Sequence, residues 1–349
     1  YQNWYPAVEF ETKNTVTNVG LFELSPFSKY EIKGEQAHSE LQRICTANIK
    51  NEIGRSTYTQ MLNEAGGIET DLTVICIDKD CFRIISSAAT RTHDKAHILK
   101  HLSPNLEFKD ITDDLVCLGI FGPKSRNLIS KISNDDFSKE NFKFGYGKFV
   151  TINSKKVWAQ RLSYVGELGF ELYIENKDAK EIYQLIIEEG KNHNLSHCGS
   201  HAMDTMRMES GFLHWGHDIS PEENQYQAGL NFAISYRKEV NFIGKESLLK
   251  VKEKKHDRRF IMLSLLDSKP GSPLLLHEEP IYLKDKIIGR TTSGNYSFNF
   301  KKNLSFGYVT SNHTNEELSK MDLYIEVAKQ KYPAKVEITP LKDKSSRFL

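Results

Sequence analysis

The 349-residue sequence has no long apolar run and no excess of charge of either sign. Its apolar stretches, such as residues 72–77, have the length of a strand, whereas a membrane-spanning helix needs about 20 apolar residues. Lys and Arg number 47 against 46 Asp and Glu, and no basic block is interleaved with aromatic residues as in nucleic-acid-binding surfaces. We therefore expect a protein that crosses no membrane, binds no nucleic acid and acts on a small molecule.

Cysteine is scarce, and its pattern does not suggest disulfides. The five cysteines are odd in number, scattered and mostly inside apolar runs, which suits buried thiols in a reducing compartment better than a disulfide framework. The chain begins at Tyr1 without an initiator methionine, a secretory signal or a transit-peptide pattern. We expect a cytoplasmic protein, or a mitochondrial-matrix protein in a eukaryote, with an upstream part missing from this sequence.

Several common catalytic signatures are also missing. No complete dinucleotide fingerprint, GxxxxGK[ST] loop or GxSxG elbow is present. Histidines recur every fourth residue at 93–101 and at 193–201, a spacing that aligns imidazoles on one helix face. The first series is expected at the solvated edge of a helix that buries Ala96, Ile98 and Leu99, and Gly199 interrupts the second. No metal site is predicted.

The rest of the chain alternates helix-like and strand-like segments of ordinary length. Apolar residues at helical spacing predict amphipathic helices over residues 34–49 and 178–190, the second opened by a capping box of Asp178 and Glu181 and ended by Gly190. Short β-rich runs between turn residues predict meandering antiparallel sheets. These runs cover residues 57–63, 71–77, 81–86, 116–121, 149–152 and 156–162.

A charged helix marks the expected boundary between two domains. Residues 246–259 read as a helix that ends in a cluster of charges, after which short strands with Gly and Asn turns follow. We expect an α+β chain with a first domain at residues 1–255 and a β-rich module at 256–349. Five runs with the spacing of a small barrel or jelly roll support the module, at residues 261–265, 281–283, 287–291, 305–309 and 323–327.

Two glycine-rich stretches gather side chains that can carry chemistry. Between Tyr58 and Asp71 the sequence predicts a strand, a Gly-Gly turn that permits close approach of a ligand, and a second strand that begins with an acid. Because Asp is a poor strand residue, Asp71 is either a functional carboxylate or an Asx-turn cap of the hairpin. The stretch from Tyr164 to Tyr173 packs carboxylates, glycines and an aromatic into a turn, and is either a ligand site or an ordinary hairpin.

An ordered series of phrases along nearly the whole chain resembles the folate-binding aminomethyltransferase family of the glycine-cleavage T-protein. Within it, YTQMLNEAGG, YVGELGFELY and NQYQAGLNFAI are most similar to the C-terminal half of dimethylglycine and sarcosine dehydrogenases, in which a flavin domain precedes the folate domain. The series consists of VGLFELSPFSKYEIKG at 19–34, NEAGGIETDL at 63–72, LGIFGPKSR at 118–126, SYVGELGFELY at 163–173, HAMDTMRMESG at 201–211, FIGKESL at 242–248 and IGRTTSGNYS at 288–297.

This resemblance implies a fold and an activity. The fold would be three-lobed and ring-like, with the β-rich module as the last lobe and tetrahydrofolate in a central channel. In such enzymes a flavin half, which holds FAD, oxidises an N-methyl amine to an iminium, and the folate half captures the methylene carbon as 5,10-methylenetetrahydrofolate. The resemblance thus implies folate, a methylated amine or its iminium, and an upstream flavin domain or subunit as partners of this chain.

The resemblance also implies roles for five residues. Asp71 matches the acid that serves the family as a base, and a carboxylate suits this role because a newly alkylated aryl nitrogen is strongly acidic. Glu171 matches the glutamate that recognises the pterin, whose two N–H donors one carboxylate can accept in a plane. Tyr164 matches a tyrosine of the folate pocket, and Tyr58 and Asn63 are expected in the pocket wall.

One departure from the family leaves the folate glutamate tail without a partner. T-proteins carry an Arg where this chain has Met203, and Arg207, one helical turn on, is either the replacement or a structural ion-pair partner. Two other functions stay open, a non-catalytic folate-binding module and a folate-dependent demethylase of another methyl donor. The lack of a KGCYxGQE-like motif and the presence of Asp71 favour the transferase over the first, and the dehydrogenase-like phrases favour it over the second.

Overall fold

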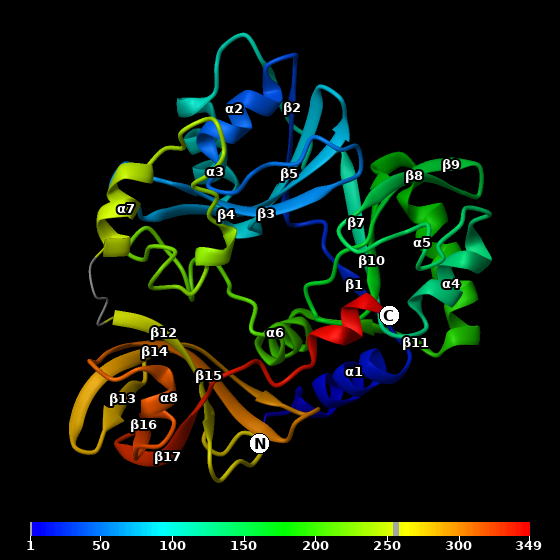
Figure 1. The fold of residues 1–349 in the computed structure, drawn as a ribbon. Coiled ribbons are helices and arrows are strands. Elements are labelled where there is room, and N and C mark those ends of the chain that lie inside the picture. Colours follow the sequence, from blue (N-terminus) through cyan, green and yellow to red (C-terminus); the bar gives the residue numbers. More distant parts are fainter. Residues whose placement is uncertain (1, 254–257) are drawn as a thin grey trace.

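Three lobes surround a common centre in the computed structural model, which describes residues 2–253 and 258–349 (Figure 1). Two lobes are open sheets covered by helices, and the third is a barrel. The expected α+β class and the three-lobed arrangement are therefore confirmed. The expected domain boundary near residue 255 lies outside the described residues.

The first lobe is an antiparallel sheet whose apolar face packs against helices α2 (Ala37–Ile44) and α3 (Arg91–His101). Tyr30, Leu41 and Ile98 are fully buried between the sheet and these helices. In spatial order the strands are β3 (Ser56–Leu62), β4 (Ile68–Asp78), β5 (Cys81–Ser86), β2 (Ser28–Lys33) and β6 (Glu107–Asp110), and the helices are α2, α3 and, beside the β3–β4 hairpin, α7 (Lys245–Glu253).

Two predictions in this lobe need correction. The helix predicted over residues 34–49 ends at Ile44, because Cys45 is extended and forms a β-bridge with Met61. Strand β4 begins at Ile68, so Asp71 lies inside the strand rather than at its start. The hairpin is instead capped by Asn63, whose Oδ1 accepts the Gly67 N–H at 2.9 Å. The Asx-turn interpretation thus applies to Asn63 and not to Asp71.

The second lobe is a six-stranded sheet in which only one neighbouring pair is parallel, β1 with β11. Its predicted helix does not use the expected capping box: the helix begins at Asn176, and Asp178 and Glu181 lie 3.3 and 3.7 Å from Lys155 instead. In spatial order the strands are β11 (Leu195–Cys198), β1 (Val19–Glu23), β7 (Leu115–Phe121), β10 (Gly169–Glu175), β9 (Lys155–Gln160) and β8 (Gly147–Ile152), and the helices are α4 (Ser125–Ile132) and α5 (Asn176–Gly190).

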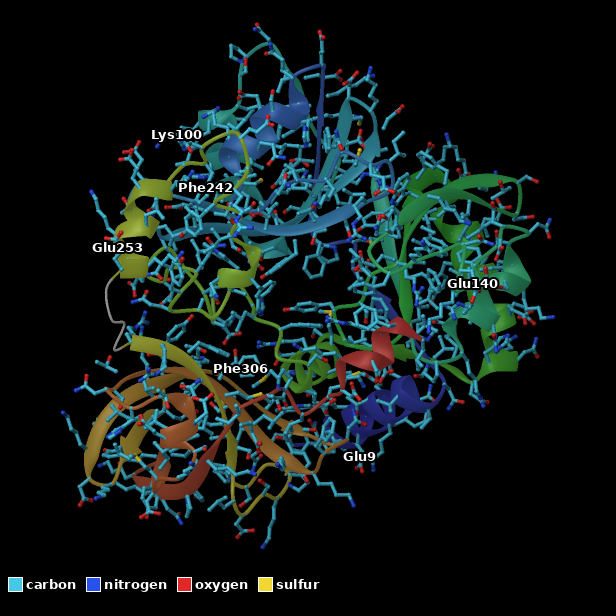
Figure 2. The ribbon with its side chains drawn as sticks, in the orientation of Figure 1. Glu9, Lys100, Glu140, Phe242, Glu253 and Phe306 are labelled. Atoms are coloured by element: carbon cyan, nitrogen blue, oxygen red, sulfur yellow. The ribbon has the colours of Figure 1, made fainter. Side chains whose placement is uncertain are left out.

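The third lobe is a closed barrel, as the spacing of its strands predicted. Phe306 lies at the end of the barrel that faces the centre of the molecule (Figure 2). The last strand was not predicted, because its exposed positions carry Lys and its sequence contains Pro333. Around the barrel run β12 (Arg258–Leu265), β15 (Lys302–Thr310), β14 (Lys286–Ser297), β13 (Pro280–Leu283), β16 (Leu323–Val327) and β17 (Gln330–Glu337), beside the short helix α8 (Asn315–Leu318).

Helices α1 (Tyr5–Thr17) and α6 (Ser200–Glu209) lie between the second lobe and the barrel (Figure 1). After β17 the chain returns from the barrel to the second lobe, where the ring of Phe348 lies 4.9 Å from that of Phe144. The ends of the chain thus bridge these two lobes. Within the described residues, no helix is long and apolar enough to cross a membrane.

The histidine series do not converge. The first lies on α3 as predicted, but that helix buries Asp94 and Ile98, whereas Ala96 and Leu99 are exposed. The second is spread over a 3-10 turn (Lys191–His193), β11 and α6. In the parts of the chain that are described, no group of three or more His, Cys, Asp or Glu side chains could hold a metal ion. The five cysteines are free thiols.

The β3–β4 hairpin depends on close approach of another backbone at Gly67. A Cβ atom there would lie 2.1 Å from the carbonyl oxygen of Pro221, whereas a Cβ at Gly199 would meet only the Glu11 carboxylate at 3.8 Å. We expect Gly67→Ala to lower the free energy of unfolding by about 2 kcal/mol or more, because backbone must shift to relieve the overlap. Gly199→Ala should cost less than about 1 kcal/mol. Urea denaturation of both variants tests this, and equal losses would contradict it.

Candidate functional site

A cavity of about 1180 Å³ lies where the three lobes meet, and residues of every lobe line it. The first lobe contributes β4 and the second contributes β10 with the loop before it. Helix α6, barrel strand β14 and the segment after β17 complete the wall. A cavity of this size can hold a ligand as large as an organic cofactor.

Asp71 presents its carboxylate to this cavity from the middle of β4. The side-chain amide of Gln60, its cross-strand neighbour on β3, donates to Asp71 Oδ1 at 2.7 Å. Burial raises the pKa of the Asp71 carboxyl to about 6, although Gln60 and the Tyr58 hydroxyl, which also contacts it, act in the opposite direction. Asp94 lies behind and raises this pKa further. Asp71 is therefore placed to exchange a proton near neutral pH.

Glu171 faces the same cavity from β10. The Tyr173 hydroxyl, two residues along the same face of the strand, donates to Glu171 Oε2 at 2.7 Å. Burial raises the pKa of the Glu171 carboxyl to about 7, and the Tyr173 hydrogen bond opposes this only partly. Among the described residues, neither Glu171 nor Asp71 has a salt-bridge partner. The carboxylate of Glu171 thus retains acceptor positions for N–H donors of a ligand.

Two aromatic pairs form flat walls. The ring of Tyr164 stacks on Phe212 at a centroid distance of 6.0 Å, and its hydroxyl donates to the carbonyl oxygen of Leu213 at 3.0 Å. Tyr58 stacks on Phe232 at 6.2 Å, and these rings are 37% and 73% exposed. The second pair therefore lies at an opening of the cavity, whereas Tyr164 is deeper inside.

Arg207 lines the cavity, but all three nitrogens of its guanidinium donate to protein acceptors. Its guanidinium, on a side chain only 2% exposed, lies 2.6 Å from Asp218 and 2.8 Å from Asp204. It also donates to Ser293 Oγ at 2.9 Å and to the Phe212 carbonyl oxygen at 3.0 Å. Of its two predicted interpretations, the structural ion-pair partner agrees with this geometry.

Asn63 is the one predicted site residue that the structure does not bring into the cavity wall. Its amide nitrogen donates to Glu69 Oε1 at 2.9 Å while its oxygen caps the hairpin, so both ends are used locally. Sequence reasoning also missed Gln60 and Tyr173. The register of the β3–β4 hairpin and the two-residue alternation along β10 were the signals that could have found them.

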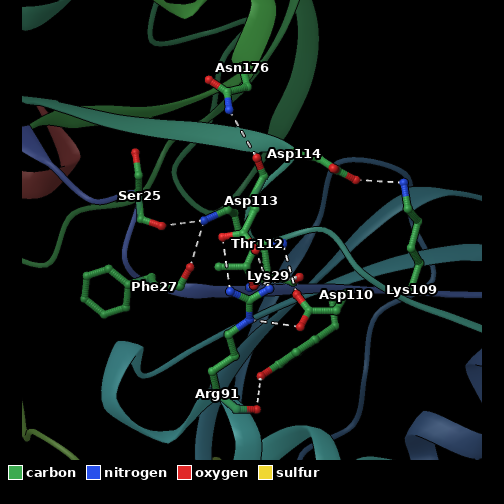
Figure 3. Close-up of polar contacts among 11 residues, drawn as sticks. Ser25, Phe27, Lys29, Arg91, Lys109, Asp110, Thr112, Asp113, Asp114 and Asn176 are labelled. Atoms are coloured by element: carbon green, nitrogen blue, oxygen red, sulfur yellow. Dashed lines mark hydrogen bonds and ion pairs between the residues drawn. The ribbon is translucent and has the colours of Figure 1, made fainter.

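Lys29 lines the cavity, and its ammonium group contacts Ser25 and Phe27 (Figure 3). Its Nζ donates to the carbonyl oxygens of Ser25 and Phe27, each at 2.8 Å, and burial lowers the pKa of the ammonium. Nearby, Arg91 pairs with Asp110 at 2.9 Å and fastens α3 to the end of β6. Lys29 thus fixes the turn between β1 and β2 that forms this side of the wall.

Residues 1–238 match the family described as the GCVT N-terminal domain, and residues 258–343 match the glycine cleavage T-protein C-terminal barrel domain. The chain belongs to the glycine cleavage T-protein family. The resemblance inferred from the sequence is therefore confirmed. This family is of the folate-dependent aminomethyltransferase type.

Several known proteins are similar over nearly the whole chain. The 4-methylaminobutanoate oxidase (formaldehyde-forming) of Paenarthrobacter nicotinovorans is 35% identical over 98% of this chain and 41% of its own length. Mitochondrial dimethylglycine dehydrogenase of Rattus norvegicus is 34% identical over 97% of this chain and 39% of its own length. The chain thus spans about two fifths of these relatives, but 90% of the aminomethyltransferase of Anoxybacillus flavithermus, which is 29% identical.

The T-protein fold is also found in a solved structure. The glycine cleavage system aminomethyltransferase T of Bartonella henselae superposes with a TM-score of 0.85 at 22% sequence identity, covering 97% of this chain and 90% of that one. This likeness confirms the expected architecture, including the position of the barrel as the last lobe.

Because Glu171 is buried, the free energy of unfolding is expected to depend on pH. Because its folded pKa of about 7 lies above the ordinary 4.5, its stabilising contribution is complete below about pH 4.5 and is lost as pH rises through 7. We expect the unliganded wild type to lose about 2 kcal/mol relative to Glu171→Gln between pH 5 and pH 8. Urea denaturation across this range, with exposed Glu175→Gln as the control, tests this. Parallel curves for wild type and Glu171→Gln would contradict it.

Proposed function

We propose that the central cavity binds tetrahydrofolate and that the chain transfers to it the methylene carbon of an oxidised N-methyl amine, giving 5,10-methylenetetrahydrofolate. The observation that carries this proposal is the pair of carboxylates, Asp71 and Glu171, that face one cavity from two lobes. One carboxylate has room for ligand donors, and the other lies beside an opening. Recognition and proton transfer can therefore be assigned to different residues.

Glu171 fits the edge of a pterin ring. That edge carries an exocyclic amine and a ring N–H, two donors that point the same way, and a carboxylate accepts both in one plane. Tyr173 donates to Oε2 from the protein side and so fixes the rotation of the carboxylate. The Tyr164–Phe212 pair adds a flat wall for a ring system.

The glutamate tail of folate needs cations. Lys342 in the C-terminal wall of the cavity is paired with Glu167, and three other cations line this side: Arg55, Lys344 and Arg347. Within the described residues, none of the three forms an ion pair. Arg347 lies over the ring of Phe212 at 5.9 Å, and its Nε is buried without a hydrogen-bond partner. These cations replace Arg207, whose donors are occupied, as our candidates for the tail.

Asp71 acts as the base in this proposal. Bound tetrahydrofolate supplies a nucleophilic nitrogen that accepts the one-carbon unit. Asp71 accepts the proton that this nitrogen releases as it bonds to the methylene carbon, and the bond from that carbon to the amine breaks so that the amine leaves with a proton. With a pKa of about 6 the Asp71 carboxylate is mostly ionised at pH 7.5 yet more basic than an ordinary aspartate. Tyr58 and Gln60 hold the carboxylate in place during this step.

The donor is inferred from the relatives. Two of them are named for the oxidation of N-methyl compounds, 4-methylaminobutanoate and dimethylglycine, and this chain matches only about two fifths of each. We therefore propose that a flavin-dependent domain or subunit, with FAD, oxidises a dimethylglycine- or sarcosine-type amine and passes its methylene carbon to the cavity described here.

Binding is tested with Glu171→Gln. The variant loses one charge-assisted acceptor and leaves one pterin N–H without its partner, so we expect the Kd for tetrahydrofolate to rise about ten- to a hundredfold. Isothermal titration calorimetry of wild type, Glu171→Gln and the control Glu175→Gln measures this. Equal affinities of wild type and Glu171→Gln would remove Glu171 from the site.

Catalysis is tested with Asp71→Asn, which keeps the shape of the side chain but cannot accept the proton. We expect the rate of methylenetetrahydrofolate formation from tetrahydrofolate and formaldehyde, above the uncatalysed background, to fall at least about a hundredfold while folate still binds. Asp78→Asn, at the exposed end of the same strand, is the control. A wild type that binds folate without catalysing transfer would instead indicate a non-catalytic binding module.

A further inference from the structure

Behind Asp71 runs a chain of buried hydrogen bonds that the proposed reaction does not yet explain. Gln60 Nε2 donates to Asp71 Oδ1 at 2.7 Å, and Gln225 Nε2 donates to Gln60 Oε1 at 2.5 Å. Gln225 Nε2 also donates to Thr46 Oγ1 at 3.0 Å, and the Thr46 hydroxyl donates to the carbonyl oxygen of Ala233 at 3.1 Å. Gln60, Gln225 and Thr46 are all fully buried.

The chain has one direction, which a backbone group sets. The carbonyl oxygen of Ala233 can only accept, so the Thr46 hydroxyl donates to it and must accept from Gln225. The Gln225 amide nitrogen then also faces Gln60 Oε1, and this leaves Gln60 only its N–H group to present to Asp71. A fixed donor favours the ionised form of Asp71, because a carboxylate oxygen accepts an N–H more strongly than an oxygen of the protonated carboxyl group does.

We propose that Gln60 is a positioning residue for Asp71, held by Gln225 so that an N–H donor always faces the carboxylate. This inference rests on the proposed role of Asp71 as the base. The relay fixes the rotation of the carboxylate and keeps it ionised at the pH at which it accepts a proton. Gln60 touches neither substrate nor folate in this assignment and acts only through Asp71.

The same relay joins Asp71 to the opening of the cavity. Gln225 and Ala233 belong to the irregular segment between α6 and α7, and Phe232, next to Ala233, stacks on Tyr58. One segment therefore supports both the hydrogen-bond partner of Asp71 and the aromatic wall beside it. We expect a ligand that moves Phe232 to affect the orientation of Asp71 as well.

Other groups near Asp71 act on its protonation independently of Gln60. The Tyr58 hydroxyl contacts it from the same strand as Gln60, the Asp94 carboxylate lies on α3, and the Tyr164 hydroxyl belongs to the loop before β10. Replacing Gln60 leaves all three in place. A change in the titration of Asp71 in a Gln60 variant can then be assigned to the lost N–H donor.

The test is a direct titration of Asp71. The full chain is labelled with [4-13C]aspartate, and its carboxyl signals are followed by NMR against pH, with Asp71→Asn identifying the signal of interest. We expect Gln60→Met to raise the midpoint for Asp71 by about one pH unit, since a hydrogen bond to the charged form is lost. Gln225→Met should raise the midpoint less. Gln60 can still donate to the ionised Asp71 in this variant, although it can also turn its oxygen toward a protonated Asp71.

Gln42→Met is the matched control, because Gln42 is a buried amide whose side chain donates to Asn48 and to the carbonyl oxygen of Ile49, outside the hydrogen-bond chain of Asp71. An unchanged midpoint in Gln60→Met, or an equal shift in Gln42→Met, would overturn the proposal. If Gln60→Met does not fold, Gln225→Met decides the question by the same measurement.

The titration needs neither folate nor turnover, so its result is separate from that of the proposed function. A shifted midpoint without transfer activity would leave the relay standing and remove the role of Asp71 as the base. Where transfer activity is present, the acidic limb of kcat against pH should move upward by the same amount in Gln60→Met. The KM for tetrahydrofolate should stay within about twofold, as expected when an interaction made in the transition state is weakened.

Discussion

The arrangement of this molecule depends on one buried ion pair, Arg207 with Asp218, at the junction of the lobes. Asp218 accepts hydrogen bonds from Arg207, from Thr292 and Ser293 of barrel strand β14, and from the backbone N–H of His214. A buried pair of this kind seldom adds much net stability, since desolvation offsets the attraction. Removing one partner leaves the other as an unpaired buried charge, which costs about 3–5 kcal/mol. Its contribution is therefore geometric: it fixes α6 against the barrel, and the cavity keeps its shape.

A cavity enclosed in this way changes the chemistry of the acids that face it. Asp71 and Glu171 come from different lobes and have no salt-bridge partner among the described residues, so burial raises the pKa of each toward neutrality. The cost of desolvating them falls on the folded protein before any ligand arrives. A ligand that donates hydrogen bonds to Glu171 recovers part of that cost, which favours recognition of a donor-rich ring edge over an apolar ligand.

The sequence predicted much of this, and its errors have local physical causes. The barrel and most strands followed from turn residues and β-rich runs, and the motif resemblance located Asp71, Glu171 and Tyr164 in the wall of one cavity. Asn63 lies outside that wall, where its amide oxygen accepts the Gly67 N–H of the Gly-Gly turn. Gln225 could not be found, since its contact with Gln60 joins residues 165 positions apart and depends on tertiary packing.

In the proposed function, dividing recognition and proton transfer between Glu171 and Asp71 resolves a conflict that a single acid would face. A group that recognises the ligand must hold a fixed orientation, whereas a base must change its protonation during the reaction. Tyr173 donates a hydrogen bond to Glu171 from the same strand, so the orientation of the Glu171 carboxylate does not depend on the other lobes. Asp71 is supported across the hairpin by Gln60, and through Gln225 by the segment that also carries Phe232 at the opening. Glu171, the proposed recognition residue, is therefore held by its own strand. Asp71, the proposed base, is connected through Gln60 and Gln225 to the wall at the cavity opening, which a ligand meets first.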